Sequence, residues 1–122
     1  MRAGLFRARE ADEFATRERL RILEVTTGHD DSGVSIARAR VAPGVTTELH
    51  SLTGVDERYL VVSGRGEMNL DASEEWFEIG AGDVVAIPAG IAQRVRNPHD
   101  EDLIFYCVCS PAFSESCYRS LE

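Results

Sequence analysis

Near the middle of the chain lie three side chains of types that can bind a divalent metal ion: His50, Glu57 and Gln93. A histidine nitrogen and a carboxylate oxygen suit Zn, Mn, Fe or Ni, and the amide oxygen of Gln93 is a weaker, harder donor. Vacant coordination positions would let such an ion bind water or substrate. An ion in this setting polarises a carbonyl or stabilises an enolate, which favours isomerase, lyase, hydrolase or cyclase chemistry over oxygen chemistry.

A fourth polar side chain, Tyr59, belongs to the same candidate site. It lies two positions after Glu57, so on a strand the two side chains share one face. Its hydroxyl could donate a proton or orient a substrate, and we place it as the candidate catalytic residue. The structural alternative is a core tyrosine with a satisfied hydroxyl. For the whole site the alternative is a barrel without metal, in which buried Glu57 takes a hydrogen bond from His50 or Gln93.

Other polar residues are weaker candidates. Arg38 and Arg40 share one face of an expected strand and could bind a phosphate or carboxylate group. Glu48 could be a second carboxylate near a metal, but a solvated loop acid is the commoner case. We expect no role in the site for Arg94, Arg96, His29 and His99.

Turn residues divide the chain into short β-rich runs. Between Gly28 and Gly90 glycines recur at intervals near ten residues, which is typical of an all-β sandwich or barrel. Residues 20–25 fit a strand better than a helix, because no helical stripe of apolar residues persists. Residues 10–14 fit a short helical turn. The other expected strands are residues 34–41, 59–62, 67–70, 76–79, 84–87, 91–96 and 103–109.

The first of two motif-like stretches surrounds His50. Five residues separate Gly44 from His50, and six separate Glu57 from Gly64. This spacing resembles the first motif of the cupin family, which is a glycine, five residues, His-x-His, three or four residues, Glu, six residues and Gly. Leu52 stands where that motif has its second histidine.

The second stretch resembles the second cupin motif, which is a glycine, five residues, Pro-x-Gly, two residues, His, three residues and Asn. Here the matching residues are Gly82, Pro88, Gly90 and Asn97, and Gln93 stands in the place of the histidine. His-x-Leu in the first motif and Gln in the second resemble a subgroup of small bacterial cupins labelled mannose-6-phosphate-isomerase-like. That label rests on fold and implies little about substrate.

The resemblance implies an all-β, double-stranded β-helix (jelly-roll) cupin barrel. We expect a single domain over residues 1–122, with a conserved barrel over about 34–110, extra strands over 1–33 and a tail over 111–122. In the family the metal is held by two histidines and a glutamate of the first motif and one histidine of the second. Carried over, this supports His50, Glu57 and Gln93 as ligands. The resemblance also implies a homodimer. The tail either packs against the barrel or a partner subunit, or frays.

The composition of the chain limits the classes of molecule that it could bind and the compartment in which it is expected. The 13 basic and 21 acidic residues give a formal net charge of −8, which argues against nucleic acid, because phosphates would be repelled. No run approaches the roughly 20 apolar residues that span a bilayer, and no signal peptide is evident. We therefore expect a cytoplasmic protein. An odd number of cysteines without a Cys-x-x-Cys pair favours reduced, mostly buried thiols at Cys107, Cys109 and Cys117.

The sequence thus predicts a small metal-binding cupin, a metal-dependent enzyme acting on a small polar metabolite such as a sugar or organic acid. The alternative is a non-catalytic cupin that binds a small molecule, with or without metal. A purely structural subunit is the third reading, and it leaves the polar residues at the ligand positions without a purpose.

Overall fold

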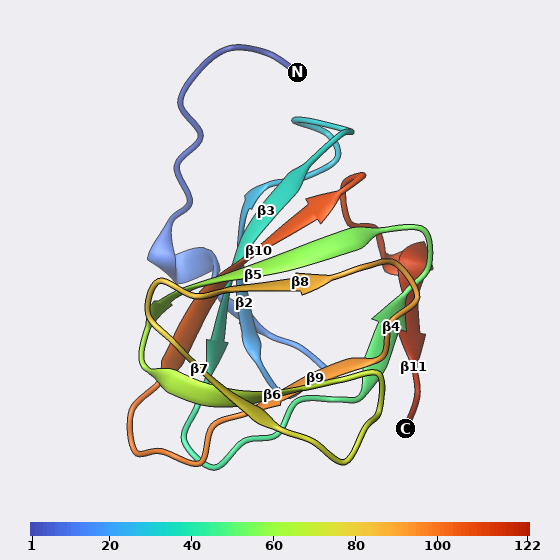
Figure 1. Ribbon diagram of the computed structural model, residues 1–122. Helices are drawn as coiled ribbons and strands as arrows, with labels where there is room; N and C mark the ends of the chain where they lie inside the picture. Colours follow the sequence, from blue (N-terminus) through green and yellow to red (C-terminus); the bar gives the residue numbers. More distant parts are fainter.

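Two antiparallel sheets face each other in the computed structural model, which describes residues 1–122 (Figure 1). The six-stranded sheet has the order β1-β2-β3-β10-β5-β8, and the five-stranded sheet the order β11-β4-β9-β6-β7. Strands distant in sequence alternate between the sheets, so the chain forms the expected all-β jelly-roll barrel. Closing a sheet in this way leaves few free strand edges.

The strands are short, as the spacing of turn residues predicted. The six-stranded sheet contains β1 (Phe14–Ala15), β2 (Arg21–Thr26), β3 (Ser35–Val41), β10 (Leu103–Ser110), β5 (Asp56–Ser63) and β8 (Val84–Ile87). The five-stranded sheet contains β11 (Tyr118–Ser120), β4 (His50–Leu52), β9 (Gln93–Arg96), β6 (Arg65–Leu70) and β7 (Phe77–Gly80). Two 3-10 turns, η1 (Glu10–Asp12) and η2 (Glu115–Cys117), complete the structure. All the expected strands and the expected turn near residue 10 are present, and β1 lies within residues 1–33, where extra strands were expected; β4 and β11 were not expected.

Alternation along β5 sets the inward face that carries the site. Glu57, Tyr59 and Val61 are buried, whereas the residues between them are exposed. Phe105 of β10 is fully buried and its ring stacks on that of Tyr59 with centroids 4.1 Å apart. This inward face therefore continues from an apolar core at one end of the barrel into a polar region at the other.

Two turns show why particular residues occupy them. Gly64, between β5 and β6, has φ +78°, and a Cβ there would collide with the carbonyl oxygen of Asp102. Only glycine is compatible with this conformation and this contact. At the tip between β6 and β7, Asp71 and Ala72 both adopt positive φ, 61° and 52°. Together these turns set the reversals that the sequence predicted.

The arginines proposed as anion binders are engaged elsewhere. Arg38 forms ion pairs with Glu10 at 2.6 Å and with Glu13 at 3.0 Å, and Arg40 forms them with Glu13 at 3.1 Å and Asp102 at 3.0 Å. These contacts hold η1 against the outer side of β3, so neither guanidinium faces the inside of the barrel.

The segment after β10 packs on the barrel. β11 pairs with β4, with Ser120 opposite His50 and Tyr118 opposite Leu52. The segment before η1 runs away from the barrel instead (Figure 1). None of the structure's helical segments has the length and apolar character needed to cross a bilayer.

Candidate functional site

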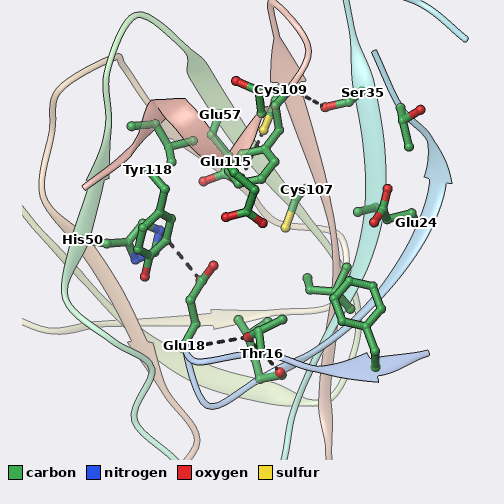
Figure 2. A pocket seen from close by; sticks show the side chains of 18 of the residues that line it. Thr16, Glu18, Glu24, Ser35, His50, Glu57, Cys107, Cys109, Glu115 and Tyr118 are labelled. Atoms are coloured by element: carbon green, nitrogen blue, oxygen red, sulfur yellow. Dashed lines mark hydrogen bonds and ion pairs between the residues drawn. The ribbon is translucent and has the colours of Figure 1, made fainter. Parts of the chain in front are cut away.

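A cavity of about 580 Å³ opens between β2 and β3 on one side and β4 and β11 on the other (Figure 2). Its aromatic side chains are Phe14, Tyr59, Phe113 and Tyr118. Its carboxyl groups are those of Glu18, Glu24, Glu57 and Glu115. The other polar lining includes Arg17, His50, Cys107 and Cys109. The cavity therefore combines a large volume with many titratable groups.

Glu57, Gln93 and Tyr59 form one buried chain of hydrogen bonds. The Tyr59 hydroxyl donates to Oε1 of Gln93 at 2.5 Å, and Nε2 of Gln93 donates to Oε1 of Glu57 at 2.9 Å. Cys109 donates to the other Glu57 oxygen at 3.3 Å. Burial raises the pKa of the Glu57 carboxyl, and the bonds from Gln93 and Cys109 oppose that rise. Every polar end of this chain therefore has a protein partner.

His50 lies beside this chain on β4, opposite Gln93 of β9. Its ring is 3% exposed and stacks on Tyr118 with centroids 4.7 Å apart. Nδ1 lies 2.8 Å from the carbonyl oxygen of Glu48. Because a carbonyl only accepts, Nδ1 carries the hydrogen. Burial lowers the His50 pKa, so at neutral pH the ring is uncharged and Nε2 offers a lone pair.

Glu18 lies across from that lone pair. Its Oε2 is 3.8 Å from Nε2 of His50, and its side chain is 20% exposed. Burial, helped by the nearby carboxylates of Glu57 and Glu48, raises the pKa of Glu18 to about 8. At neutral pH this carboxyl is therefore mostly protonated and can donate a proton.

The backbone around Glu18 is fixed by several contacts. Its carbonyl accepts a hydrogen bond from the Glu48 amide at 3.0 Å, and its own amide donates to the Thr16 hydroxyl at 3.2 Å. The Arg19 side chain donates to the carbonyl of Thr46 at 2.8 Å. The bonds from Glu48 and to Thr46 join the segment before β2 to the segment before β4, and so they hold Glu18 close to His50.

The three predicted metal ligands do not fit a common ion in this arrangement. His50 and Glu57 line the cavity, but Gln93 is fully buried behind them and its oxygen is bonded to Tyr59. The amide nitrogen, which cannot bind a metal, is the atom that meets Glu57. In addition, no three His, Cys, Asp or Glu side chains converge closely enough to hold a metal ion. As arranged, these residues therefore do not form a three-ligand metal site.

Tyr59 lines the cavity on the same face as Glu57, as the spacing predicted. Burial, together with the nearby Glu57 carboxyl, raises its pKa well above the ordinary value. The hydroxyl thus stays protonated and donates a hydrogen bond to Gln93. A role for Tyr59 as acid or base stays a prediction.

Sequence reasoning missed Glu18, which lies outside both motifs. Glu18 lies in the turn between β1 and β2, where Arg19 has φ +72°. A period-two pattern therefore does not reach Glu18, although it could find the lining residues of β2, which are Ile22, Glu24 and Thr26. Tyr118 was missed for another reason: β11 has only three residues, and no β-rich run marks it.

Comparison with known proteins identifies the family. The family model for the cupin domain matches residues 37–109, more than half of the chain, so the protein belongs to the cupin family. It is 34% identical over 88 residues to the uncharacterized protein MJ1618 of Methanocaldococcus jannaschii, covering 72% of this chain and 69% of that one.

Solved structures show the same fold. A variant of Streptomyces PAC13 with uridine has a TM-score of 0.80 at 20% identity, covering 99% of this chain and 92% of that chain. A predicted oxalate decarboxylase of Thermotoga maritima has a TM-score of 0.72 at 20% identity, covering 85% and 97%. Oxalate decarboxylase of Bacillus subtilis has a TM-score of 0.76 at 24% identity, covering 90% of this chain but 30% of that one. At these identities the likeness concerns the barrel.

Proposed function

We propose that this cupin is an enzyme of isomerase or lyase type that moves protons on a small polar metabolite. His50 is the base and Glu18 is the acid. The observation that carries the proposal is the distance of 3.8 Å between Nε2 of His50 and Oε2 of Glu18 inside the cavity. Burial shifts their pKa values in opposite directions, so His50 is neutral and can accept a proton, whereas Glu18 is protonated and can donate one. Such a pair, with pKa values set by environment, suits acid–base catalysis near neutral pH.

The proton balance of the proposed reaction is simple. Nε2 of His50 takes a proton from a C–H group of the substrate, and the electron pair moves into a new double bond. Glu18 gives its proton either to a carbonyl oxygen, forming an enol, or to a departing hydroxyl, which leaves as water. His50 then holds the proton that Glu18 lacks, and the short distance between them allows the proton to return.

The chain of Tyr59, Gln93 and Glu57 serves as the rigid back wall of the site. Because the Glu57 oxygens accept hydrogen bonds from Gln93 and Cys109, Glu57 stays in one orientation. Its position near Glu18 contributes to the raised Glu18 pKa. The similarity of fold to PAC13, described as a nucleoside dehydratase, supports an elimination as one form of the reaction.

Deuterium exchange tests this function. Protein is incubated in D₂O with a panel of sugars, amino sugars, hydroxy acids and nucleosides, and loss of C–H signals is followed by proton NMR. Exchange or product formation is expected with wild type and is lost with His50→Gln and Glu18→Gln. Exchange that persists unchanged in both variants contradicts the assignment. Binding without exchange supports the non-catalytic alternative.

A metal-dependent enzyme is the second candidate. The observation in its favour is the Nδ1–H bond of His50 to a backbone carbonyl, which is how metal-binding histidines are commonly oriented. A related fold also contains Mn(II) centres in Bacillus subtilis oxalate decarboxylase. A Zn, Mn, Fe or Ni ion at His50 and Glu57 would need the Gln93 amide to turn. If EDTA abolishes the exchange and added metal restores it, this candidate replaces the first. Membership of the mannose-6-phosphate-isomerase-like subgroup stays a prediction.

We also propose that the chain forms a homodimer through the outer face of the six-stranded sheet. Leu60 and Val62 of β5 and Val84 of β8 are 41%, 44% and 62% exposed on that face. Apolar exposure over neighbouring strands is typical of a subunit contact. Light scattering should give twice the chain mass, and Val84→Glu together with Leu60→Glu should give the monomer.

A further inference from the structure

We propose that the ligand of the cavity carries an ammonium group, and that the cavity selects organic cations over neutral and anionic molecules. The inference rests on the proposed function only in that the cavity is the substrate site. It goes further by naming the substrate's charge and its hydrogen-bonding groups.

First, His50 offers the cavity a hydrogen-bond acceptor. The Nδ1–H of His50 is used by the Glu48 carbonyl, so Nε2 has only a lone pair to offer. The His50 side chain is 3% exposed, and Nε2 faces the cavity without a hydrogen bond from the protein; the Glu18 carboxyl is 3.8 Å away. An acceptor that faces a cavity in this way favours a ligand that brings a donor. An ammonium group brings several.

The second argument is charge. Glu18, Glu57 and Glu115 point into the cavity from different elements, and Glu24 lies on the facing strand β2 (Figure 2). Glu18 is protonated near neutral pH and burial raises the pKa of Glu57, so Glu24 and Glu115 are the acids left to stabilise a bound cation. The lining has one arginine, Arg17, and an anion would be repelled by the same two acids.

The third argument is the aromatic lining. Arg17 already shows how a cation is held here, since its guanidinium lies 4.4 Å from the centre of the Tyr118 ring. Tyr118 is occupied by Arg17 and His50, but Phe14 and Phe113 are 43% and 36% exposed and carry no protein cation. Aromatic faces next to carboxylates are the usual surroundings of bound organic ammonium groups.

The spacing of the acids distinguishes an organic cation from a metal ion. The carboxylates are distributed around about 580 Å³, and no three His, Cys, Asp or Glu side chains converge on one point. A bare ion needs ligands within about 2–2.6 Å of one centre. A larger molecule with a separate ammonium group can contact these carboxylates one at a time.

The experiment uses three probes of one shape and different charge: cyclohexylammonium, cyclohexanol and cyclohexanecarboxylate. Binding to the whole protein is measured at millimolar concentrations and neutral pH by ligand-observed NMR. We expect the ammonium probe to bind about tenfold more tightly than the alcohol, and the carboxylate more weakly than either. Equal binding of all three, preference for the carboxylate, or no binding of the ammonium probe overturns the inference.

Variants locate the binding. Glu115→Gln and Glu24→Gln should each weaken the ammonium probe several-fold and leave the alcohol unchanged, with thermal unfolding as the check on folding. Glu78→Gln removes an exposed carboxylate of β7 outside the cavity and is the matched control. If Glu78→Gln weakens the probe as much, the effect is one of net charge and the inference fails. Charge selectivity without deuterium exchange contradicts only the proposed enzyme, and exchange without selectivity contradicts only this inference.

Discussion

Nε2 of His50 and Oε2 of Glu18 lie 3.8 Å apart although they come from opposite walls of the barrel. His50 belongs to β4 of the five-stranded sheet, and Glu18 precedes β2 of the six-stranded sheet. Closure of the barrel brings them together, and burial then acts on both in opposite directions: it lowers the pKa of the base and raises that of the acid. The pair is therefore neutral in the range where most enzymes work.

The first prediction concerns the pH profile of the deuterium exchange. Exchange needs neutral His50 and protonated Glu18, so it should decrease as pH falls through the His50 pKa, which lies below its ordinary value of 6.5. It should also decrease as pH rises through about 8, where Glu18 ionises. The rate is measured by NMR between these limits and beyond them. A rate that rises steadily above pH 8 contradicts the role of Glu18 as acid.

The second prediction concerns stability and Glu18. Its pKa is raised from 4.5 to about 8, so between these values the folded protein binds more protons than the unfolded chain. The free energy of unfolding therefore decreases as pH rises through this window. Gln at this position does not ionise. At pH 9 the free energy of unfolding of Glu18→Gln should therefore exceed that of wild type by about 1–3 kcal/mol, after allowance for the partial exposure of Glu18.

Urea unfolding at pH 5 and pH 9 measures this difference. Glu78→Gln is the control for loss of an exposed carboxylate and should show little change in the difference between the two pH values. A gain for Glu18→Gln at pH 9 with loss of exchange would show that the charge arrangement favours function over stability. A Glu18→Gln variant that is no more stable than wild type at pH 9 would mean that burial does not raise the Glu18 pKa.

The sequence predicted the barrel and the shared face of Glu57 and Tyr59, but not the contacts of Gln93 or the position of Glu18. Glu57 and Tyr59 were placed correctly on one face because alternation along a single strand determines it. The contacts of Gln93 depend instead on two strands of different sheets, β9 and β5, so no local pattern could show that its oxygen meets Tyr59. Glu18 lies outside the two motifs, and contacts between distant segments, including the pairing of β2 with β3 and the bond from the Glu48 amide, bring it into the cavity.

The third prediction tests the hydrogen-bonded chain. Tyr59→Phe keeps the ring that stacks on Phe105 but removes the donor to Gln93 Oε1, which is fully buried. An acceptor left without a partner in the interior costs about 1–3 kcal/mol. Urea unfolding should show that loss, whereas Tyr106→Phe, on the outward side of β10, should change stability little. Equal stability of the Tyr59→Phe variant and wild type would mean that Gln93 finds another donor.

The fourth prediction concerns metal. Leu52 lines the cavity beside His50, and Gln93 is committed to Tyr59 and Glu57. Replacing both, as Leu52→His with Gln93→His, restores the ligand types of the cupin motifs that this sequence resembles. Elemental analysis of untagged protein purified without chelator should find near-stoichiometric metal in the double variant and only traces in wild type. Stoichiometric metal in wild type, lost in Glu57→Ala, would instead establish the metal-dependent candidate.

The last prediction concerns Glu122, whose carboxylate joins the two segments that carry the acid and the base. It accepts hydrogen bonds from Arg19 at 2.9 Å and from the Leu49 amide at 2.6 Å, next to Glu18 and His50 respectively. The Arg19–Glu122 pair is exposed, so its loss should change the unfolding temperature little. Glu122→Ala should nevertheless loosen the segment around Glu18, admit water and lower the Glu18 pKa below about 8. NMR titration of that carboxyl measures the shift, and Asp12→Ala, which breaks the exposed pair with Arg9, is the matched control. A Glu18 pKa that stays the same in both variants would show that the other backbone contacts alone position the acid.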